Sequence, residues 1–241
     1  VHGSVSLVKL EETKVIIDIH SHIKLDGQQP LFQDMDKNGI DYRIVSCLSE
    51  PDTKIANKFV EELVSAHPDR LGGCAVINPK QRDCAEECER FLENPAMKMV
   101  EFNSLEHGYY PDVCEGVDKV LEVVAKNQAI VKVFSGIVEK YPQIPFIFLH
   151  MGCFDYGYGC VDLAGRYENI YLETSNQYEV QILKKAVTTA PQDKLLFGSS
   201  YPERLTKCSL DVLDMFHLDE GFRKKIFGEN AAALLNLNLK H

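Results

Sequence analysis

The sequence of 241 residues lacks the patterns that mark several classes of protein. Its eight cysteines include no C-x-x-C pair, which argues against a zinc ribbon or a disulfide framework and favours reduced thiols. No stretch approaches the roughly 18 consecutive apolar residues of a membrane-spanning helix. Basic residues form no stripe, and the formal net charge of −10 repels nucleic-acid phosphates. We therefore expect a cytoplasmic protein that binds a small-molecule substrate, and neither nucleic acid nor a membrane.

The composition provides enough apolar material for one large core. Hydrophobic residues make up 45% of the chain and charged residues 26%, which is ordinary for a globular protein. A chain of 241 residues suits a single α/β barrel, a fold that usually needs about 250 residues. No linker or low-complexity segment divides the sequence. We expect one domain over residues 1–241. The sequence does not decide between a monomer and a homodimer.

Short runs of apolar and β-branched residues alternate with helix-like stretches. In stretches such as NKFVEELVSAHPDR, apolar residues recur at helical spacing. Parallel strands need a crossover between them, so this alternation predicts a parallel sheet. Eight repeats favour a (β/α)8 TIM barrel over an open sheet. The eight candidate strands are VIIDIH (15–20), YRIVSCL (42–48), LGGCAVINP (71–79), KMVEFN (98–103), AIVKVFSG (129–136), PFIFLHMG (145–152), NIYLETS (169–175) and KLLFGSS (194–200).

One interval between these strands is too short for a regular crossover. Only the residues from Ile137 to Ile144 separate AIVKVFSG from PFIFLHMG, whereas a crossover with its helix usually needs at least about 10 to 12 residues. We therefore predict a somewhat shortened barrel with an abbreviated fifth crossover. Either the chain is interrupted between Val133 and Tyr141, or a short, irregular connection replaces the helix.

The first predicted strand ends in Asp18-Ile19-His20-Ser21-His22. Because side chains alternate along a strand, positions 18, 20 and 22 are predicted to point the same way. Two adjacent imidazoles can share a divalent metal ion, and Asp18 can orient one ring by accepting its other N–H. Reactive groups of a barrel lie at the C-terminal ends of its strands. The position of the motif therefore predicts a metal site at His20 and His22.

Blocks along nearly the whole chain resemble the amidohydrolase superfamily. Within it, they are similar to the branch of amidohydrolase-2 and aminocarboxymuconate-semialdehyde decarboxylase-like proteins, in the same order. Any single block is weak, but eight in register identify the family. They are IIDIHSH (16–22), MDKNGIDYRIV (35–45), HPDRLGGCAVINP (67–79), LEHGYYPD (105–112), KYPQIPFIFLHMG (140–152), NIYLETS (169–175), LLFGSSYP (195–202) and IFGENAAALLNL (226–237).

The resemblance implies one metal ion held by two strand-one histidines, a histidine ending strand five and an aspartate ending strand eight. A strand-six histidine assists the chemistry. His20, His22 and His150 match this pattern. Phe134, however, stands at the strand-five position, so one ligand is missing. Ser200 stands where relatives carry aspartate, so the usual general base is missing as well.

Other polar residues at the strand ends can complete the site. Glu101, in the fourth strand, is the best substitute as a metal ligand and as a base, since a His/His/Glu set suits zinc. Asn103 lies on the same face as Glu101, and His107 lies in the loop that follows. Both are candidate substrate contacts, with surface exposure an equal alternative for His107.

For three further residues, a purely structural role is the alternative to a role in the active site. His150 could be a satisfied core histidine, but its loop opens on the same barrel mouth as His20, which favours a catalytic role in polarising a carbonyl or moving a proton. For Lys132, a salt bridge inside the barrel is favoured over carboxylation and metal binding. For Glu173, a buried hydrogen-bonding role is favoured over a direct role in the site.

Metal-dependent hydrolysis of a small lactone, ester or amide is the leading functional hypothesis. The cofactor expected is a divalent metal ion, Zn²⁺ first, which lowers the pKa of bound water and polarises a carbonyl. Metal-dependent non-oxidative decarboxylation is the alternative within the same family, because fold alone does not separate the two reactions. A degenerate, non-catalytic barrel is the third hypothesis, and Phe134 and Ser200 are the reason for it.

Overall fold

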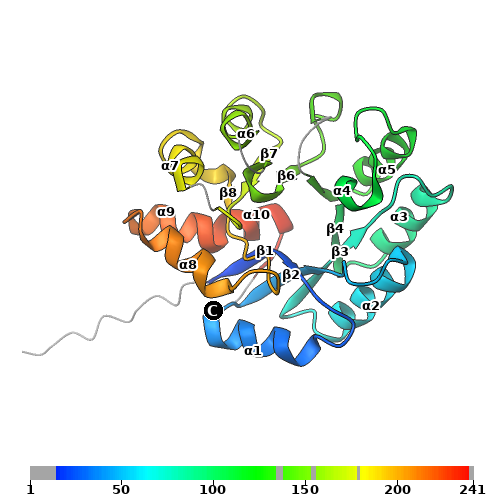
Figure 1. The fold of residues 1–241 in the computed structure, drawn as a ribbon, viewed down its shortest axis with the longest axis horizontal. Coiled ribbons are helices and arrows are strands. Elements are labelled where there is room, and N and C mark those ends of the chain that lie inside the picture. The colour runs from blue at the N-terminus through cyan, green and yellow to red at the C-terminus, as the bar shows by residue number, and fades with distance from the viewer. Residues whose placement is uncertain (1–14, 134–137, 153–155, 178–179, 239–241) are drawn as a thin grey trace, which may run out of the picture.

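Eight parallel strands form one sheet in which each strand pairs with its neighbour in the sequence. The structure, a computed structural model, describes residues 15–133, 138–152, 156–177 and 180–238. A bridge between Ser21 and Tyr201 joins the first strand to the segment after the last one, so the sheet curls into a barrel (Figure 1). The strands are β1 (Ile17–His22), β2 (Tyr42–Ser46), β3 (Leu71–Val76), β4 (Met97–Glu101), β5 (Ile130–Val133), β6 (Phe146–Phe148), β7 (Ile170–Glu173) and β8 (Leu195–Leu196).

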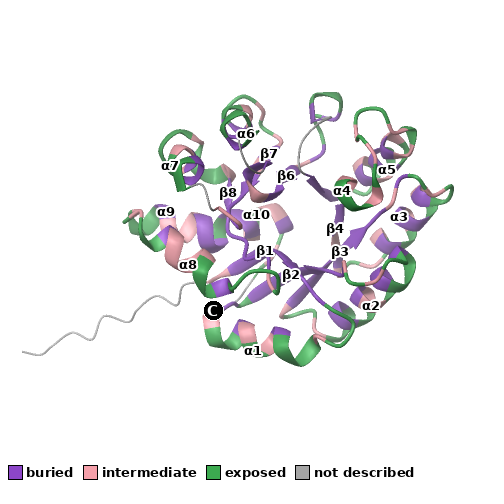
Figure 2. Cartoon of the chain, in the orientation of Figure 1, coloured by how far each residue is buried: buried purple, intermediate pink, exposed green. Residues whose placement is uncertain are grey.

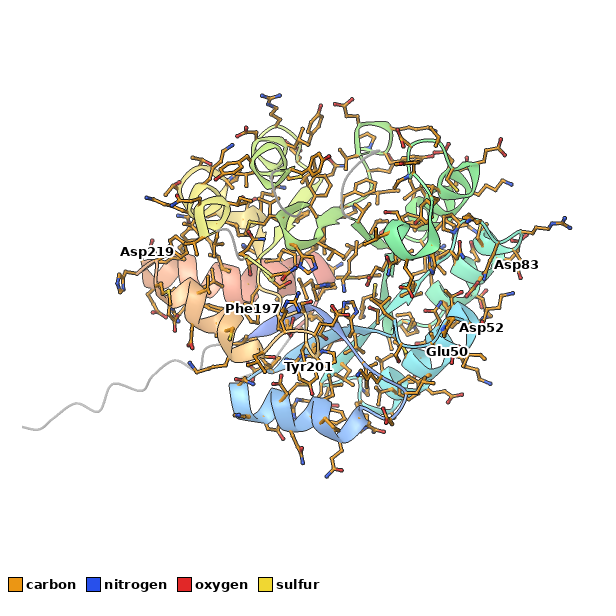
Figure 3. All side chains as sticks on the ribbon, in the orientation of Figure 1. Glu50, Asp52, Asp83, Phe197, Tyr201 and Asp219 are labelled. Atoms are coloured by element: carbon orange, nitrogen blue, oxygen red, sulfur yellow. The ribbon has the colours of Figure 1, made fainter. Side chains whose placement is uncertain are left out.

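Helices surround the barrel on its outer side, as Figure 1 shows. Asp52 and Asp219, both labelled in Figure 3, begin two of them by accepting a hydrogen bond from a backbone N–H of the first turn. The α-helices are α1 (Gln28–Asn38), α2 (Thr53–Ala66), α3 (Cys84–Leu92), α4 (Ser104–His107), α5 (Glu115–Lys126), α6 (Tyr156–Ala164), α7 (Val180–Thr189), α8 (Thr206–Asp214), α9 (Glu220–Lys224) and α10 (Asn230–Leu235). The shorter helical turns are η1 (Val138–Lys140), η2 (Leu149–Gly152), η3 (Gln192–Lys194) and η4 (Lys225–Glu229).

Two apolar clusters hold the barrel together. Figure 2 shows that the strands are mostly buried. The larger cluster lies between the strands and the helices, as expected for helices with one apolar face. The smaller cluster fills the inside of the barrel with side chains such as Ile17, Ile44, Met99 and Ile147, and α10 contributes Leu235 to it. Polar residues near the ends of β1, β4 and β7 are buried as well. The inside is therefore a packed core with the polar site above it.

The connection from β5 to β6 is abbreviated, as the sequence predicts. Its residues 138–145 contain only the short turn η1, with no helix of three turns, and residues 134–137, including Phe134, lie outside the described part of the chain. The Asn169 side-chain amide compensates for the missing helix by donating to the carbonyls of Val138, Tyr141 and Ile144 at 3.1–3.3 Å. This amide supplies hydrogen bonds that a helix would otherwise make internally.

Among the described residues, no helix has the length and apolar composition needed to cross a lipid bilayer.

Candidate active site

His20 lies at the centre of the polar site. It is only 1% exposed, and neither ring nitrogen has a hydrogen-bond partner among the described residues. Its ring centroid is 4.8 Å from that of His22 and 5.1 Å from that of His150. Burial, assisted by the positive charge of Lys132 and by the two neighbouring histidines, holds the pKa of His20 well below its usual value. The imidazole is therefore neutral and offers a lone pair to a ligand.

Asp18 turns away from the histidines, contrary to the predicted alternation. The pairing of β1 with β2 shifts register between Asp18 and Ser21, so a bulge interrupts the period of two. The Asp18 carboxylate forms an ion pair with Arg43 Nε at 2.9 Å and accepts hydrogen bonds from Oγ and N of Ser199 at 2.5 and 3.0 Å. The prediction that Asp18 orients a histidine ring is wrong, because its oxygens contact the backbone N–H of His20 and neither ring.

A serine connects Glu101 to His22. Ser46 Oγ donates to Glu101 Oε2 at 2.9 Å and lies 2.9 Å from His22 Nδ1. Because the only hydroxyl proton of Ser46 goes to the carboxylate, Nδ1 of His22 must carry the proton that it shares with Ser46. This arrangement fixes the tautomer of His22 and leaves the lone pair on Nε2. We name Glu101, Ser46 and His22 the first relay.

A second serine connects Glu173 to His150 in the same way. Ser175 Oγ donates to Glu173 Oε2 at 2.9 Å and lies 2.9 Å from His150 Nδ1. The backbone N–H groups of His150 and Ser175 also donate to the Glu173 carboxylate. Burial alone would raise the pKa of Glu173, but the hydrogen bonds and the charge of His150 outweigh it and lower this pKa. We name Glu173, Ser175 and His150 the second relay.

Gly198, which follows β8, leaves the space that Glu173 occupies. A Cβ atom at this position would overlap Glu173 Oε1. The nearby Phe197 and Tyr201, labelled in Figure 3, belong to the same segment. Position 198 therefore has a steric requirement for glycine, because any side chain there would collide with the buried carboxylate of Glu173.

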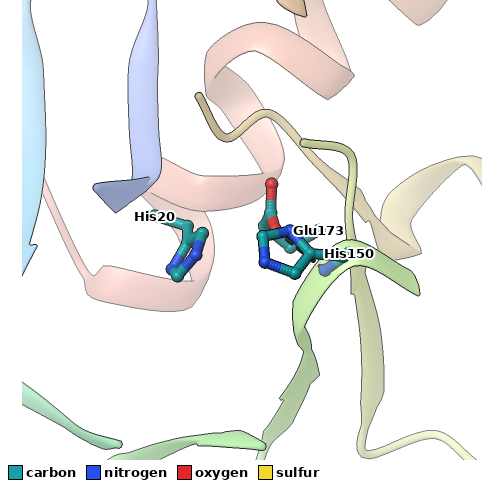
Figure 4. A group of neighbouring side chains, drawn as sticks. All are labelled: His20, His150 and Glu173. Carbon is teal, nitrogen blue, oxygen red and sulfur yellow. Dashed lines mark hydrogen bonds and ion pairs between the residues drawn. The ribbon is translucent and has the colours of Figure 1, made fainter. Parts of the chain in front are cut away.

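The donor set fits a divalent metal ion. One ligand atom from each of His20, His150 and Glu173 lies within 4.8 Å of the others, and Figure 4 shows the three side chains facing one another. The unpartnered nitrogens of His20 add to this fit, since buried imidazole nitrogens are normally hydrogen-bonded. The predicted set of His20, His22 and Glu101 shares His20 with this group, but does not form such a group in the described structure. It stays a prediction.

Ser200 is buried at the position where the resemblance implies an aspartate. Its backbone N–H donates to the carbonyl of His20 at 2.8 Å, and its φ of 56° lies in the left-handed region. The segment after β8 is thus joined to β1 directly beside the histidines. It brings a hydroxyl there and no carboxylate, so the site has no base from β8 in the usual place.

The two predicted substrate contacts lie in the loop after β4. Asn103 is half-buried and begins α4, where its side chain exchanges hydrogen bonds with Glu106. His107 ends α4, and its Nδ1 is buried without a hydrogen-bond partner in the described structure. Burial lowers the pKa of His107, so its ring is neutral. Substrate contact by Asn103 or His107 stays a prediction.

Sequence reasoning missed the two serines. Ser46 ends β2, and Ser175 lies just beyond the end of β7, so both occupy the end of the barrel where reactive groups are expected. The positions of the two serines at strand ends are a weak indication of function, because serine is common there. The carboxylate and imidazole groups that they contact cannot be identified from the local sequence. For Glu173, the favoured buried hydrogen-bonding role is found. The favoured salt bridge of Lys132 is absent from the described structure, where its Nζ has no partner.

A profile of the family described as "Amidohydrolase" matches residues 48–237. The chain therefore belongs to the amidohydrolase family, as the sequence blocks indicate. A curated relative, the gamma-resorcylate decarboxylase of a Polaromonas species, is 28% identical over 123 residues, which cover 43% of this chain. The match spans 38% of the length of that relative.

Solved structures of similar fold confirm the barrel. The 2,6-dihydroxybenzoate decarboxylase from Rhizobium has a TM-score of 0.75 at 18% identity, covering 92% of this chain and 99% of that one. A dihydroxybenzoic acid decarboxylase from a Polaromonas species, with bound manganese and the inhibitor 2-nitroresorcinol, has a TM-score of 0.72 at 20% identity, covering 93% and 97%. At these identities the likeness establishes the fold.

Proposed function

We propose that the protein is a metal-dependent, non-oxidative decarboxylase of a small aromatic carboxylic acid. Sequence features alone favour hydrolysis of a lactone, ester or amide and keep decarboxylation as the alternative. The names of the relatives support the alternative, because the curated relative and both solved structures are decarboxylases of hydroxylated benzoic acids.

The second relay is the observation that carries this proposal. In decarboxylation, the bond between the ring carbon and the carboxylate breaks, CO₂ leaves, and the electron pair that stays on the ring carbon takes up a proton. Glu173 Oε2 lies 3.4 Å from His150 Nδ1 and stabilises the protonated imidazole. His150 can then deliver the proton from Nε2. Its side chain keeps 11% exposure, so solvent can return the proton after each turnover.

Hydrolysis has weaker support from the same residues. Activation of water needs a carboxylate or imidazole that can accept its proton, and Ser200 stands at the usual position of that base. The nearby carboxylates of Glu101 and Glu173 already accept hydrogen bonds from Ser46 and Ser175. A protonated histidine beside a buried carboxylate suits the donation of a proton better than its removal from water.

Of the donor set His20, His150 and Glu173, the last two are engaged with Ser175 in the second relay. We therefore propose that His20 and its neighbour His22 would hold the divalent ion, with Glu101 acting through Ser46 to orient the ring of His22. A bound ion would supply positive charge that attracts and orients the oxygen atoms of the substrate. The sequence favours zinc, whereas the Polaromonas structure contains manganese. We therefore include both ions in the test.

Carbon dioxide release from 2,6-dihydroxybenzoate and 5-carboxyvanillate, with Mn²⁺ or Zn²⁺, tests the proposed function. Hydrolysis of an aryl ester and a lactone is measured in parallel. We expect CO₂ release by the parent protein and a decrease in kcat of roughly 10²- to 10⁴-fold in His150→Asn. Ester or lactone hydrolysis without CO₂ release from either acid would overturn the proposal.

His217→Asn is the matched control. His150 and His217 both have positive φ angles, of 52° and 49°, which asparagine tolerates better than most residues. His217 is exposed and follows the C-terminal end of α8, outside the residues of both relays. Its replacement should leave CO₂ release unchanged, so a loss confined to His150→Asn reports on the site and not on the backbone.

A further inference from the structure

Lys132 is a buried cation on the inner face of the barrel. It lies on β5, next to Glu101 of β4 and Ile147 of β6 in the strand register. It shares the strand face of Ile130, which belongs to the apolar cluster inside the barrel. The Lys132 side chain is completely buried. It therefore points inward and lies two residues closer than Ile130 to the end of the barrel that carries the histidines.

No group of the described structure forms a hydrogen bond or an ion pair with Lys132. The adjacent Glu101 uses Oε2 to accept hydrogen bonds from Ser46 and from the Cys74 thiol instead. A buried ammonium without a partner is costly, and proteins normally pair such a group. The polar site thus retains a positive charge that has no partner among the described residues.

The charge of Lys132 acts on the two histidines of β1. It contributes to lowering the pKa of His20 and of His22, so it lies close enough to both rings to influence their protonation. Around the barrel, β5 lies between β4, which carries Glu101, and the β6 and β7 ends, which carry the second relay. An anion that reaches Lys132 therefore lies between the two relays, beside the proposed proton donor.

We propose that Lys132 is the anion-binding residue of this site and receives the carboxylate of the acid substrate. The identity of the acid rests on the proposed function, whereas the requirement for a negative charge rests on Lys132 alone. Decarboxylation releases neutral CO₂ and leaves the negative charge on the ring carbon, where the incoming proton cancels it, so the neutral product leaves Lys132 without a partner. The site therefore distinguishes the acid from its neutral product and favours release of the product.

Binding of benzoate and of the neutral isostere benzamide tests this proposal directly. Isothermal titration and thermal shift are measured for the purified protein with and without Mn²⁺, in buffers with and without chloride. We expect benzoate to bind at least tenfold more tightly than benzamide and to raise the melting temperature more. Equal binding of the two probes by the parent protein would overturn the proposal without any variant.

Lys132→Met and the matched control Lys126→Met then identify the residue. Lys126 is an exposed lysine of α5 that pairs with Glu89. In Lys132→Met we expect the affinity for benzoate to fall at least tenfold, to the level of benzamide, while the affinity for benzamide stays unchanged. In Lys126→Met we expect both affinities to equal those of the parent protein. Removal of an unpaired buried charge should also raise the melting temperature without ligand. Lys132→Gln serves the same purpose if the methionine variant does not fold.

The outcomes separate this inference from the proposed function. Unchanged benzoate affinity in folded Lys132→Met or Lys132→Gln overturns the anion-binding role and leaves CO₂ release as a separate result. Chloride that weakens benzoate binding to the parent protein but not to Lys132→Met supports the role. Charge-dependent benzoate binding that requires Lys132, in a protein that releases no CO₂ from any acid tested, supports the anion-binding role and counts against decarboxylation only.

Discussion

The two relays have the same chemical groups but different surroundings. In the first relay, three strands contribute one residue each, and the Glu101 carboxylate also takes a hydrogen bond from Cys74. In the second, Glu173 and Ser175 are close in sequence, and the carboxylate collects backbone and side-chain donors together with an ion pair to His150. Burial lowers the pKa of His22 despite Glu101. The difference indicates that the first relay fixes a neutral imidazole, whereas the second places its imidazole 3.4 Å from a buried carboxylate.

Removal of the second carboxylate should have the largest effect. Glu173→Gln takes a fully buried charge from the His150 pair, and we expect a loss of about 3–5 kcal/mol in the free energy of unfolding at neutral pH. Urea unfolding measures this loss. Glu101→Gln is the matched comparison, because its amide oxygen can still accept from Ser46, and it should cost about 1 kcal/mol. Equal losses would show that the two relays do not differ as described.

The effect of Glu173→Gln should depend on pH. The folded-state pKa of Glu173 lies below its ordinary value of 4.5, so its stabilising contribution is fully present above about pH 4.5 and is lost as the pH falls through the folded-state pKa. The parent and the variant should therefore converge in stability under acidic conditions. A difference that stays constant from neutral pH into the acid range would contradict the lowered pKa.

Gly198→Ala should disturb the second relay without changing any of its members. The added methyl group overlaps Glu173 Oε1, so the carboxylate must move away from Ser175 and His150. We expect a loss of about 1–3 kcal/mol in the free energy of unfolding and a lower kcat for CO₂ release. Gly159→Ala, where an added Cβ meets nothing within 4 Å, is the control. Unchanged stability and turnover in Gly198→Ala would mean that Glu173 tolerates displacement.

Serine replacements give the finest comparison of the two relays. Each of Ser46→Ala and Ser175→Ala removes one bridging hydroxyl, at about 1 kcal/mol of stability. Ser46→Ala should weaken metal binding by roughly 10- to 100-fold, because it frees the His22 ring. Ser175→Ala should instead lower kcat and leave metal binding nearly unchanged. Chelator competition measures metal binding, and CO₂ release measures kcat. Weaker metal binding in Ser175→Ala, with a lower kcat in Ser46→Ala, would show that the two relays have the opposite roles.

Local patterns predict most of the fold, because strand formation depends mainly on short apolar runs. Each of the eight predicted strands overlaps an observed one, and the shortened β5–β6 connection is found where residue spacing requires it. The site is harder to predict. Asp18 faces Arg43 because a bulge interrupts the alternation, and a bulge leaves little trace in one sequence. Ser46 and Ser175 matter only because distant strands place a carboxylate and an imidazole beside them.

The unpartnered ring of His20 has a consequence for how the site accommodates its occupant. Ser46 and Ser175 dictate which nitrogen of His22 and of His150 carries the proton. Among the described residues, no hydrogen bond makes that choice for the two tautomers of His20 or for its two ring orientations related by a half-turn. The ring of His20 can therefore adapt, whereas the rings of His22 and His150 are fixed. A ligand that enters the site can bind either ring nitrogen of His20.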